Sequence, residues 1–198
     1  MTADKLAPAH KGQSGESVRQ HNLSTVLRLV HLQGTILRSK ITATTGLNRS
    51  TVSDLVSELA ELGLLVEKET AASTGVGRPS MAVTATDNIV AFSVNPEIDA
   101  TTVSAVALSG RVVTKERRLM RSHPTADNAI AVASEMIAKM RKELEPGTRI
   151  VGVGVSVPGQ VRSSDGVIRF APQLGWVESA FAAALSQETG LPVYLGND

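Results

Sequence analysis

Near the start of the chain, apolar residues recur at helical spacing and end at clear stop signals. The stripe over residues 17–33 is followed by a glycine and predicts a first helix. Ser39 is expected to cap a short second helix, with Ile41 facing inward. Gly46 is expected to end that helix in a left-handed conformation. The pattern therefore predicts a long helix followed by a short one.

A third helix and two short strands are predicted next. Asn48 is expected to cap this helix and Gly63 to end it. Its apolar stripe consists of Val52, Leu55, Val56, Leu59 and Leu62. Residues 64–68 and 80–84 have the pattern of two strands around a glycine-rich loop. Helix, short helix, turn, helix and hairpin is the order of a winged helix-turn-helix, which we assign to residues 17–84.

Residues 85–198 change to a pattern in which strands outnumber helices. The expected strands are residues 89–94, 101–108, 112–119, 150–157 and 191–195, and the expected helices are residues 125–144 and 177–189. Residues 150–157 are nearly all apolar, as in a strand that is buried on both faces of a mixed sheet. An α/β domain is therefore predicted for residues 85–198, whereas residues 1–16 lack periodicity and are interpreted as a disordered leader.

Composition limits the class of protein. The 198 residues are 42% hydrophobic and 20% charged, as in an ordinary globular protein. Without cysteine there is no disulfide and no thiolate zinc site, and the histidines show no ligand spacing, so we expect no metal. No apolar run reaches the roughly 20 residues that span a bilayer. No signal pattern is present either, so a cytoplasmic protein without a membrane partner is expected.

Charge is unevenly distributed, although the net charge is only +1. Between residues 17 and 53 every charged residue is basic, namely Arg19, Arg28, Arg38, Lys40 and Arg49. Such a stretch is typical of a small nucleic-acid-binding module, and a basic solvated face is the alternative.

The stretch from residue 37 to residue 53 is the strongest functional signal. In a helix-turn-helix the second helix of the motif enters the major groove with its N-terminus first, so small polar and basic residues gather in its opening turns. The residues expected there are Arg49, Ser50, Thr51 and Ser53. Asn48 keeps the helix end open toward phosphate, and the DNA backbone is expected to be clamped by Arg38, Ser39 and Lys40. The alternative is a generic helical hairpin with polar caps.

The glycine-rich loop of the hairpin is a second, weaker signal. Residues 75–79 read Gly-Val-Gly-Arg-Pro. Glycines allow the backbone to approach a surface closely, and Arg78 beside a proline is expected to enter the minor groove of A·T-rich DNA. A plain interdomain turn is the alternative interpretation.

Taken together, the helix-turn-helix, the 75–79 loop and the segments 152–159 and 196–198 resemble the repressor branch of the ROK family (repressors, open reading frames and sugar kinases). The resemblance implies an actin-like, ribonuclease-H-like fold of two lobes with sugar bound in the cleft. It also implies homodimers or higher homo-oligomers that present paired DNA-binding domains. A typical member continues for as many residues again, so we expect this chain to stop before the second lobe.

The family's kinases begin this lobe with a strand and an Asp-x-Gly-Gly-Thr loop whose amides hold the phosphates of ATP. The matching residues here, 93–101, contain no glycine. Pro96 removes an amide donor, and Glu97 and Asp99 would repel triphosphate. The resemblance therefore implies a regulator that is not an enzyme and needs no cofactor.

The sugar side resembles the family more closely. Pro158 and Gly159 match its substrate loop, Gln173 stands where Asn is usual, and Asn197-Asp198 matches the pair whose Asp is the kinases' general base. A carboxylate can also simply bind a sugar hydroxyl by a charge-assisted hydrogen bond. An ordinary polar loop is the alternative for Asp198.

These observations predict a sequence-specific transcriptional regulator that represses carbohydrate genes, xylose genes among them. Its expected partners are a double-stranded DNA operator and a sugar or sugar-phosphate effector. A ROK-type sugar kinase with an added DNA-binding domain is the first alternative. In a third interpretation, a transport-system protein rather than a sugar releases the regulator from DNA.

Overall fold

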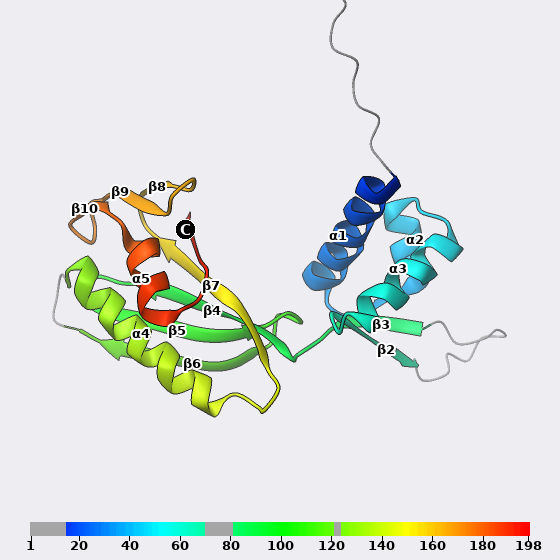
Figure 1. The fold of residues 1–198 in the computed structure, drawn as a ribbon, viewed down its shortest axis with the longest axis horizontal. Coiled ribbons are helices and arrows are strands. Elements are labelled where there is room, and N and C mark those ends of the chain that lie inside the picture. Colours follow the sequence, from blue (N-terminus) through cyan, green and yellow to red (C-terminus); the bar gives the residue numbers. More distant parts are fainter. Residues whose placement is uncertain (1–14, 70–80, 121–123) are drawn as a thin grey trace, which may run out of the picture. The chain divides into compact units, whose positions relative to one another are not determined.

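The computed structural model describes residues 15–69, 81–120 and 124–198. They belong to two compact units, Met1–Thr84 and Ala85–Asp198 (Figure 1). None of the helices in these residues is long and apolar enough to cross a membrane.

The first unit combines three helices with a small sheet. Its elements are α1 (Gly15–Gln33), β1 (Ile36–Leu37), α2 (Arg38–Thr45), α3 (Arg49–Glu61), β2 (Leu65–Glu69) and β3 (Met81–Ala85). The sheet has the order β1-β3-β2, and β1 pairs antiparallel with β3. The buried core between these elements includes Leu23, Val26, Val30, Ile41, Val52, Leu55, Val56, Leu59 and Val83. Each helix contributes one apolar side to this core, as an amphipathic helix must.

Helix ends in this unit confirm two predictions and correct a third. The Asn48 side chain accepts the Thr51 amide at 2.8 Å, so Asn48 caps α3. Gly46 ends α2 with a φ of 72°. The prediction that Ser39 caps α2 is wrong, because Leu37 occupies that position without any side-chain cap. Strand β1 runs directly into α2, so its pairing with β3 decides where the helix begins.

Three smaller differences concern the start of α1, the end of α3 and the existence of β1. α1 begins at Gly15, two residues before the predicted start. Leu62 is 55% exposed, although its spacing assigned it to the apolar stripe, because α3 ends one residue earlier at Glu61. Strand β1 was not predicted, since two residues carry no detectable alternation.

The second unit is built on a mixed five-stranded sheet. Its strands are β4 (Ile89–Pro96), β5 (Ala100–Ala107), β6 (Val112–Leu119), β7 (Arg149–Val157) and β11 (Val193–Asn197), in the order β11-β7-β4-β5-β6. β4, β7 and β11 run parallel, whereas β5 and β6 pair antiparallel. The α/β prediction for residues 85–198 is confirmed in this coarse form.

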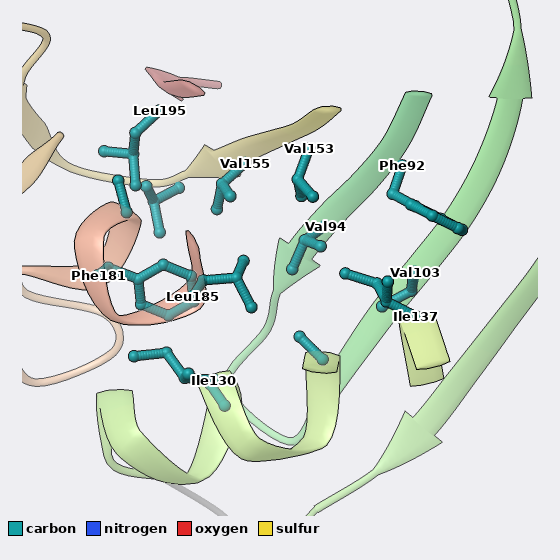
Figure 2. Close-up of a cluster of buried hydrophobic side chains, with 14 of the residues drawn as sticks. Phe92, Val94, Val103, Ile130, Ile137, Val153, Val155, Phe181, Leu185 and Leu195 are labelled. Carbon is teal, nitrogen blue, oxygen red and sulfur yellow. The ribbon is translucent and has the colours of Figure 1, made fainter. Parts of the chain in front are cut away.

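Helices α4 (Ala126–Glu143) and α5 (Phe181–Thr189) cover the sheet. Figure 2 shows Ile130 of α4 and Phe181 and Leu185 of α5 gathered over Val94 and Val155 of the central strands. All five side chains are at most 6% exposed. This apolar layer is the core of the unit.

A second, smaller sheet replaces part of a predicted helix. β8 (Gln160–Arg162), β9 (Val167–Ala171) and β10 (Trp176–Ser179) pair antiparallel in the order β10-β9-β8. The prediction of a helix from Val177 is therefore wrong, and α5 begins at Phe181. Trp176 is buried, stacks on Phe181 at 5.5 Å between ring centroids, and donates its indole N–H to the Pro124 carbonyl at 2.9 Å. Pairing with β9 and this burial outweigh the helical spacing of the segment.

We expect Asn48→Ala to lower the free energy of unfolding of the first unit by about 1 kcal/mol, because the Thr51 amide loses its acceptor. Ser39→Ala is the matched control and should change it little, since Ser39 is exposed and caps nothing. Urea unfolding followed by far-ultraviolet circular dichroism measures both. The only tryptophan, Trp176, lies in the second unit, so its fluorescence transition should stay unchanged. Equal losses from the two substitutions would contradict the assigned cap.

Gly166 and Gly190 offer a second matched pair, since both have a φ of 67°. We expect Gly190→Ala to lower the free energy of unfolding by about 1 to 2 kcal/mol, the ordinary penalty for an alanine in the left-handed conformation, because its Cβ would meet open space. Gly166→Ala should cost more, because its Cβ would lie 2.3 Å from the Cβ of Ala182 and α5 would have to shift. Urea unfolding followed by Trp176 fluorescence reports both. If Gly166→Ala lowers the free energy of unfolding no more than Gly190→Ala does, α5 can shift at this contact at little cost.

Candidate functional site

The N-terminal end of α3 is an open polar surface. Arg49 and Ser50 are exposed, and Thr51 is half-buried. The Asn48 side-chain oxygen accepts two hydrogen bonds, one from the Thr51 amide and one from the Ser50 hydroxyl, each at 2.8 Å. No acidic residue lies in the first turn. The positive end of the helix dipole is therefore uncompensated and favours an anion.

Two cations of this unit are available to such an anion. Arg49 and Lys40 are exposed. Within the described part of the chain, neither side chain makes a hydrogen bond or an ion pair. Ser39, between Arg38 and Lys40, is exposed as well.

Arg38 is placed differently from its neighbours. Its Nη2 forms an ion pair with Glu67 of β2, and its Nη1 donates to the Ser53 hydroxyl of α3 at 3.2 Å. The Arg38 and Glu67 side chains are 27% and 20% exposed. Two predicted site residues, Arg38 and Ser53, are thus brought together, but in an internal contact. Glu67 lies 29 positions along the chain, and no sequence signal marked it as a partner.

Helix α3 also forms an ion pair with α1. Arg19 of α1 forms an ion pair with Glu58 of α3. The basic stretch seen in the sequence is therefore partly neutralised in the fold. Arg78, the predicted minor-groove residue, lies outside the described residues.

A pocket in the second unit lies at the carboxyl ends of β4 and β7. Its volume is about 320 Å³, and it is lined by the 95–99 turn together with Pro158, Gln173, Leu174 and Asp198. β4 and β7 are neighbours in the sheet, but the strands that follow them lie in opposite directions: β5 lies beyond β4, and β11 lies beyond β7. Such a switch point is where α/β sheets commonly bind ligands. Three of the predicted effector residues meet there, namely Pro158, Gln173 and Asp198.

The two other predicted effector residues, Gly159 and Asn197, are next in sequence to lining residues of the pocket and contact each other. Asn197 donates its side-chain amide to the Gly159 carbonyl, which ties the end of β11 to the loop after β7. A Cβ at Gly159 would lie 2.5 Å from the Phe170 carbonyl oxygen of β9, so only glycine fits. Neither residue lines the pocket itself.

Gln173 occupies the tip of a short turn between β9 and β10. The turn is closed by hydrogen bonds from the Leu174 amide to the Ala171 carbonyl at 3.1 Å and from the Gly175 amide to the Pro172 carbonyl at 3.2 Å. Leu174 is buried, whereas Gln173 is exposed and lines the pocket, and its side-chain amide has no hydrogen-bond partner among the residues that the structure describes.

The 95–99 turn carries two carboxylates on the other side of the pocket. Glu97 accepts from Arg117 Nη2 at 2.7 Å and from the Thr102 hydroxyl at 2.6 Å, and Arg117 also reaches Asp99 at 3.0 Å. The Arg117 guanidinium and then the Thr102 hydroxyl lower the pKa of Glu97 below its ordinary value. Glu97 is therefore ionised at neutral pH. The Glu97 amide is bonded to the Ala100 carbonyl at 2.8 Å, which leaves it unavailable to a ligand.

A larger hollow of about 440 Å³ lies between residues 163–166, α5 and β11, and none of the predicted site residues lines it. The described residues contain no group of three or more His, Cys, Asp or Glu side chains that could hold a metal ion.

Comparison with known proteins identifies relatives of both units. The xylose repressor of Caldicellulosiruptor bescii is 28% identical over 91% of this chain and 46% of that protein. The DNA-binding transcriptional dual regulator NagC of Escherichia coli is 28% identical over 98% of this chain and 48% of that protein. The chain thus spans about half the length of these curated relatives.

A solved structure described as a ROK family transcriptional regulator, a homologue of the E. coli MLC protein, resembles the chain in fold. It has a TM-score of 0.64 at 21% identity and covers 91% of this chain and 46% of that one. The model of the ROK family matches residues 97–198. Because this match spans more than half of the sequence, the chain belongs to the ROK family.

Proposed function

We propose that the chain is the DNA-binding part of a transcriptional repressor and that its first unit binds double-stranded operator DNA. The relatives named xylose repressor and NagC extend over both units, which supports a regulator. The observation that carries the proposal is the open N-terminal end of α3, with exposed Arg49 and Ser50 and no acidic residue in its first turn.

In this proposal the first unit is a winged helix-turn-helix. α2 and α3 are the helix-turn-helix, and β2 and β3 are the strands of the wing. α3 enters the major groove with its N-terminus first, so that Arg49 reaches base edges and Ser50 and Thr51 follow. Lys40, exposed on α2, lies on phosphate.

The charge distribution supports this assignment. Glu58 and Glu67, which would repel phosphate, are paired with Arg19 and Arg38. Lys40 and Arg49 have no such partner among the described residues. These two cations are therefore left for the polyanion at the start of α3 and on α2, and the exposed acidic residues of α3, Asp54 and Glu61, lie further along the helix.

We infer further that the pocket at the ends of β4 and β7 receives a sugar or sugar-phosphate effector. A carboxylate at Asp198 and an amide at Gln173 suit the hydroxyls of a carbohydrate. A sugar held there alters the arrangement of the paired units of a homodimer or higher homo-oligomer and so changes operator affinity.

Catalysis is not part of the proposal. A kinase needs a cradle of amides for the triphosphate. The 95–99 turn has Pro96 without an amide proton, a Glu97 amide that is already bonded, and ionised Glu97. These features favour a binding site that recognises only the ground state of its ligand.

DNA binding is tested on sites that the chain selects from random duplexes. Arg49→Ala should weaken binding to the selected site by about 1 to 3 kcal/mol, because it removes a base contact. Lys40→Ala should weaken selected and random DNA about equally and reduce the salt slope by about one. Arg149→Ala, an exposed arginine of the second unit, is the control and should change neither. Fluorescence anisotropy at several salt concentrations measures these affinities, and selected-site binding of Arg49→Ala equal to wild type would refute the placement of α3.

The effector pocket is tested in the full-length gene product. Asp198→Asn and Gln173→Ala should each weaken the sugar-dependent release of operator DNA and leave sugar-free DNA binding near normal, because the two functions lie in different units. Calorimetry with a panel of sugars, combined with operator binding, measures both. A sugar response that neither substitution alters would remove the pocket assignment, and sugar-dependent ATP turnover would show a kinase instead.

A further inference from the structure

Arg38 joins three elements of the first unit. It is the first residue of α2, its Nη1 donates to Ser53 of α3 at 3.2 Å, and its Nη2 is paired with Glu67 of β2. The sequence pattern had assigned it, with Ser39 and Lys40, to the DNA backbone. In the structure, Arg38 instead connects α3 to β2, the strand that follows it.

The position of Arg38 requires a compensating carboxylate. A cation in the first turn of a helix opposes the helix dipole. The first turn of α2 contains no acidic residue, and Leu37 provides no side-chain cap. Glu67 supplies the missing negative charge from another element.

Partial burial makes this pair stronger than the exposed pairs of the chain. The Arg38 and Glu67 side chains are 27% and 20% exposed, so water and salt screen their attraction less than between two exposed charges. Arg38 Nε is buried and has no partner among the described residues, a cost that the contacts of Nη1 with Ser53 and of Nη2 with Glu67 must offset. To reach a phosphate, Arg38 would have to abandon a half-buried carboxylate.

We propose that Arg38 is a positioning residue for DNA recognition: it acts through Ser53 and Glu67, by fixing α3 against β2, and not by touching the DNA. The proposal rests on the DNA-binding function argued above. Lys40, two residues further along α2, differs because it is exposed and unpaired within the described residues. The two cations of one short helix therefore have different roles, one holding the groove-entering helix and the other binding phosphate.

Glu67→Gln distinguishes positioning from charge, because the two effects have opposite signs. The substitution removes a negative charge and frees Arg38, so electrostatics alone would tighten binding to all DNA. Loss of the positioning contact should instead weaken binding to the selected site about tenfold, while random DNA is bound as before or more tightly. Glu61→Gln is the matched control, since Glu61 is exposed at the end of α3 and its side chain has no partner among the described residues.

Arg38→Gln supplies the second measurement. The salt slope should remain that of the wild type, whereas Lys40→Ala lowers it by about one. Combined with Glu67→Gln, it should weaken selected-site binding no more than either single substitution, because both break one contact. Anisotropy is measured below the melting temperature of every variant, as determined by circular dichroism. Under these conditions, a change in the ratio of selected to random affinity does not arise from unfolding.

Two results would overturn the proposal while leaving the proposed function intact. One is Glu67→Gln binding the selected site as tightly as Glu61→Gln does. The other is Arg38→Gln reducing the salt slope in the manner of Lys40→Ala. If the wild-type chain selected no DNA at all, the proposed function would fail, and the role of Arg38 would fail with it.

Discussion

Burial of the apolar stripe of α3 is the constraint on which the candidate DNA surface depends. Val52, Leu55, Val56 and Leu59 are at most 2% exposed, so the helix has one rotational setting that removes all four from water. With 3.6 residues per turn, that setting directs Ser50 away from the core, whereas Arg49 lies on the flank of the stripe and is exposed as the first residue of the helix. The stripe thus determines the direction of the polar residues, and the Asn48 cap determines where the helix starts. The contacts of Glu58 and Ser53 with arginines of α1 and α2 then hold the helix on both sides.

In the second unit the same kind of constraint determines the pocket. The sheet buries one face under α4 and α5, and its parallel central strands are in register, with Val94 opposite Val155. Their carboxyl ends therefore finish at the same edge, which brings the 95–99 turn, Pro158 and Asp198 around one cavity. The ions around that cavity are arranged by the fold as well. Arg117 of β6 pairs with Glu97 and lowers the pKa of its carboxyl group, although 20 residues separate them in sequence.

The amino-acid sequence by itself determined the features that depend on neighbours along the chain. α1 and α3 have apolar residues at regular helical spacing, and the 101–119 hairpin has alternating strands around a glycine turn. Asn48 was predictable as a cap because its side chain reaches an amide only three residues away. The motifs of the family, which recur at positions 152–159 and 196–198, indicated the relatives that the comparison found.

Only the tertiary structure decided the features that depend on distant partners. Trp176–Ser179 became a strand because β9 offered a pairing edge and because the Trp176 ring could be buried on Phe181. Ser39 lost the cap position because β1, too short to detect, pairs with β3 up to the start of α2. Arg38 was predicted at the DNA backbone from its position at the start of the helix before α3, yet position along a sequence does not show which carboxylate the fold brings near it. Hydrogen bonds and ion pairs act over a few ångströms, and the distances between Arg38, Ser53 and Glu67 exist only after the elements have packed.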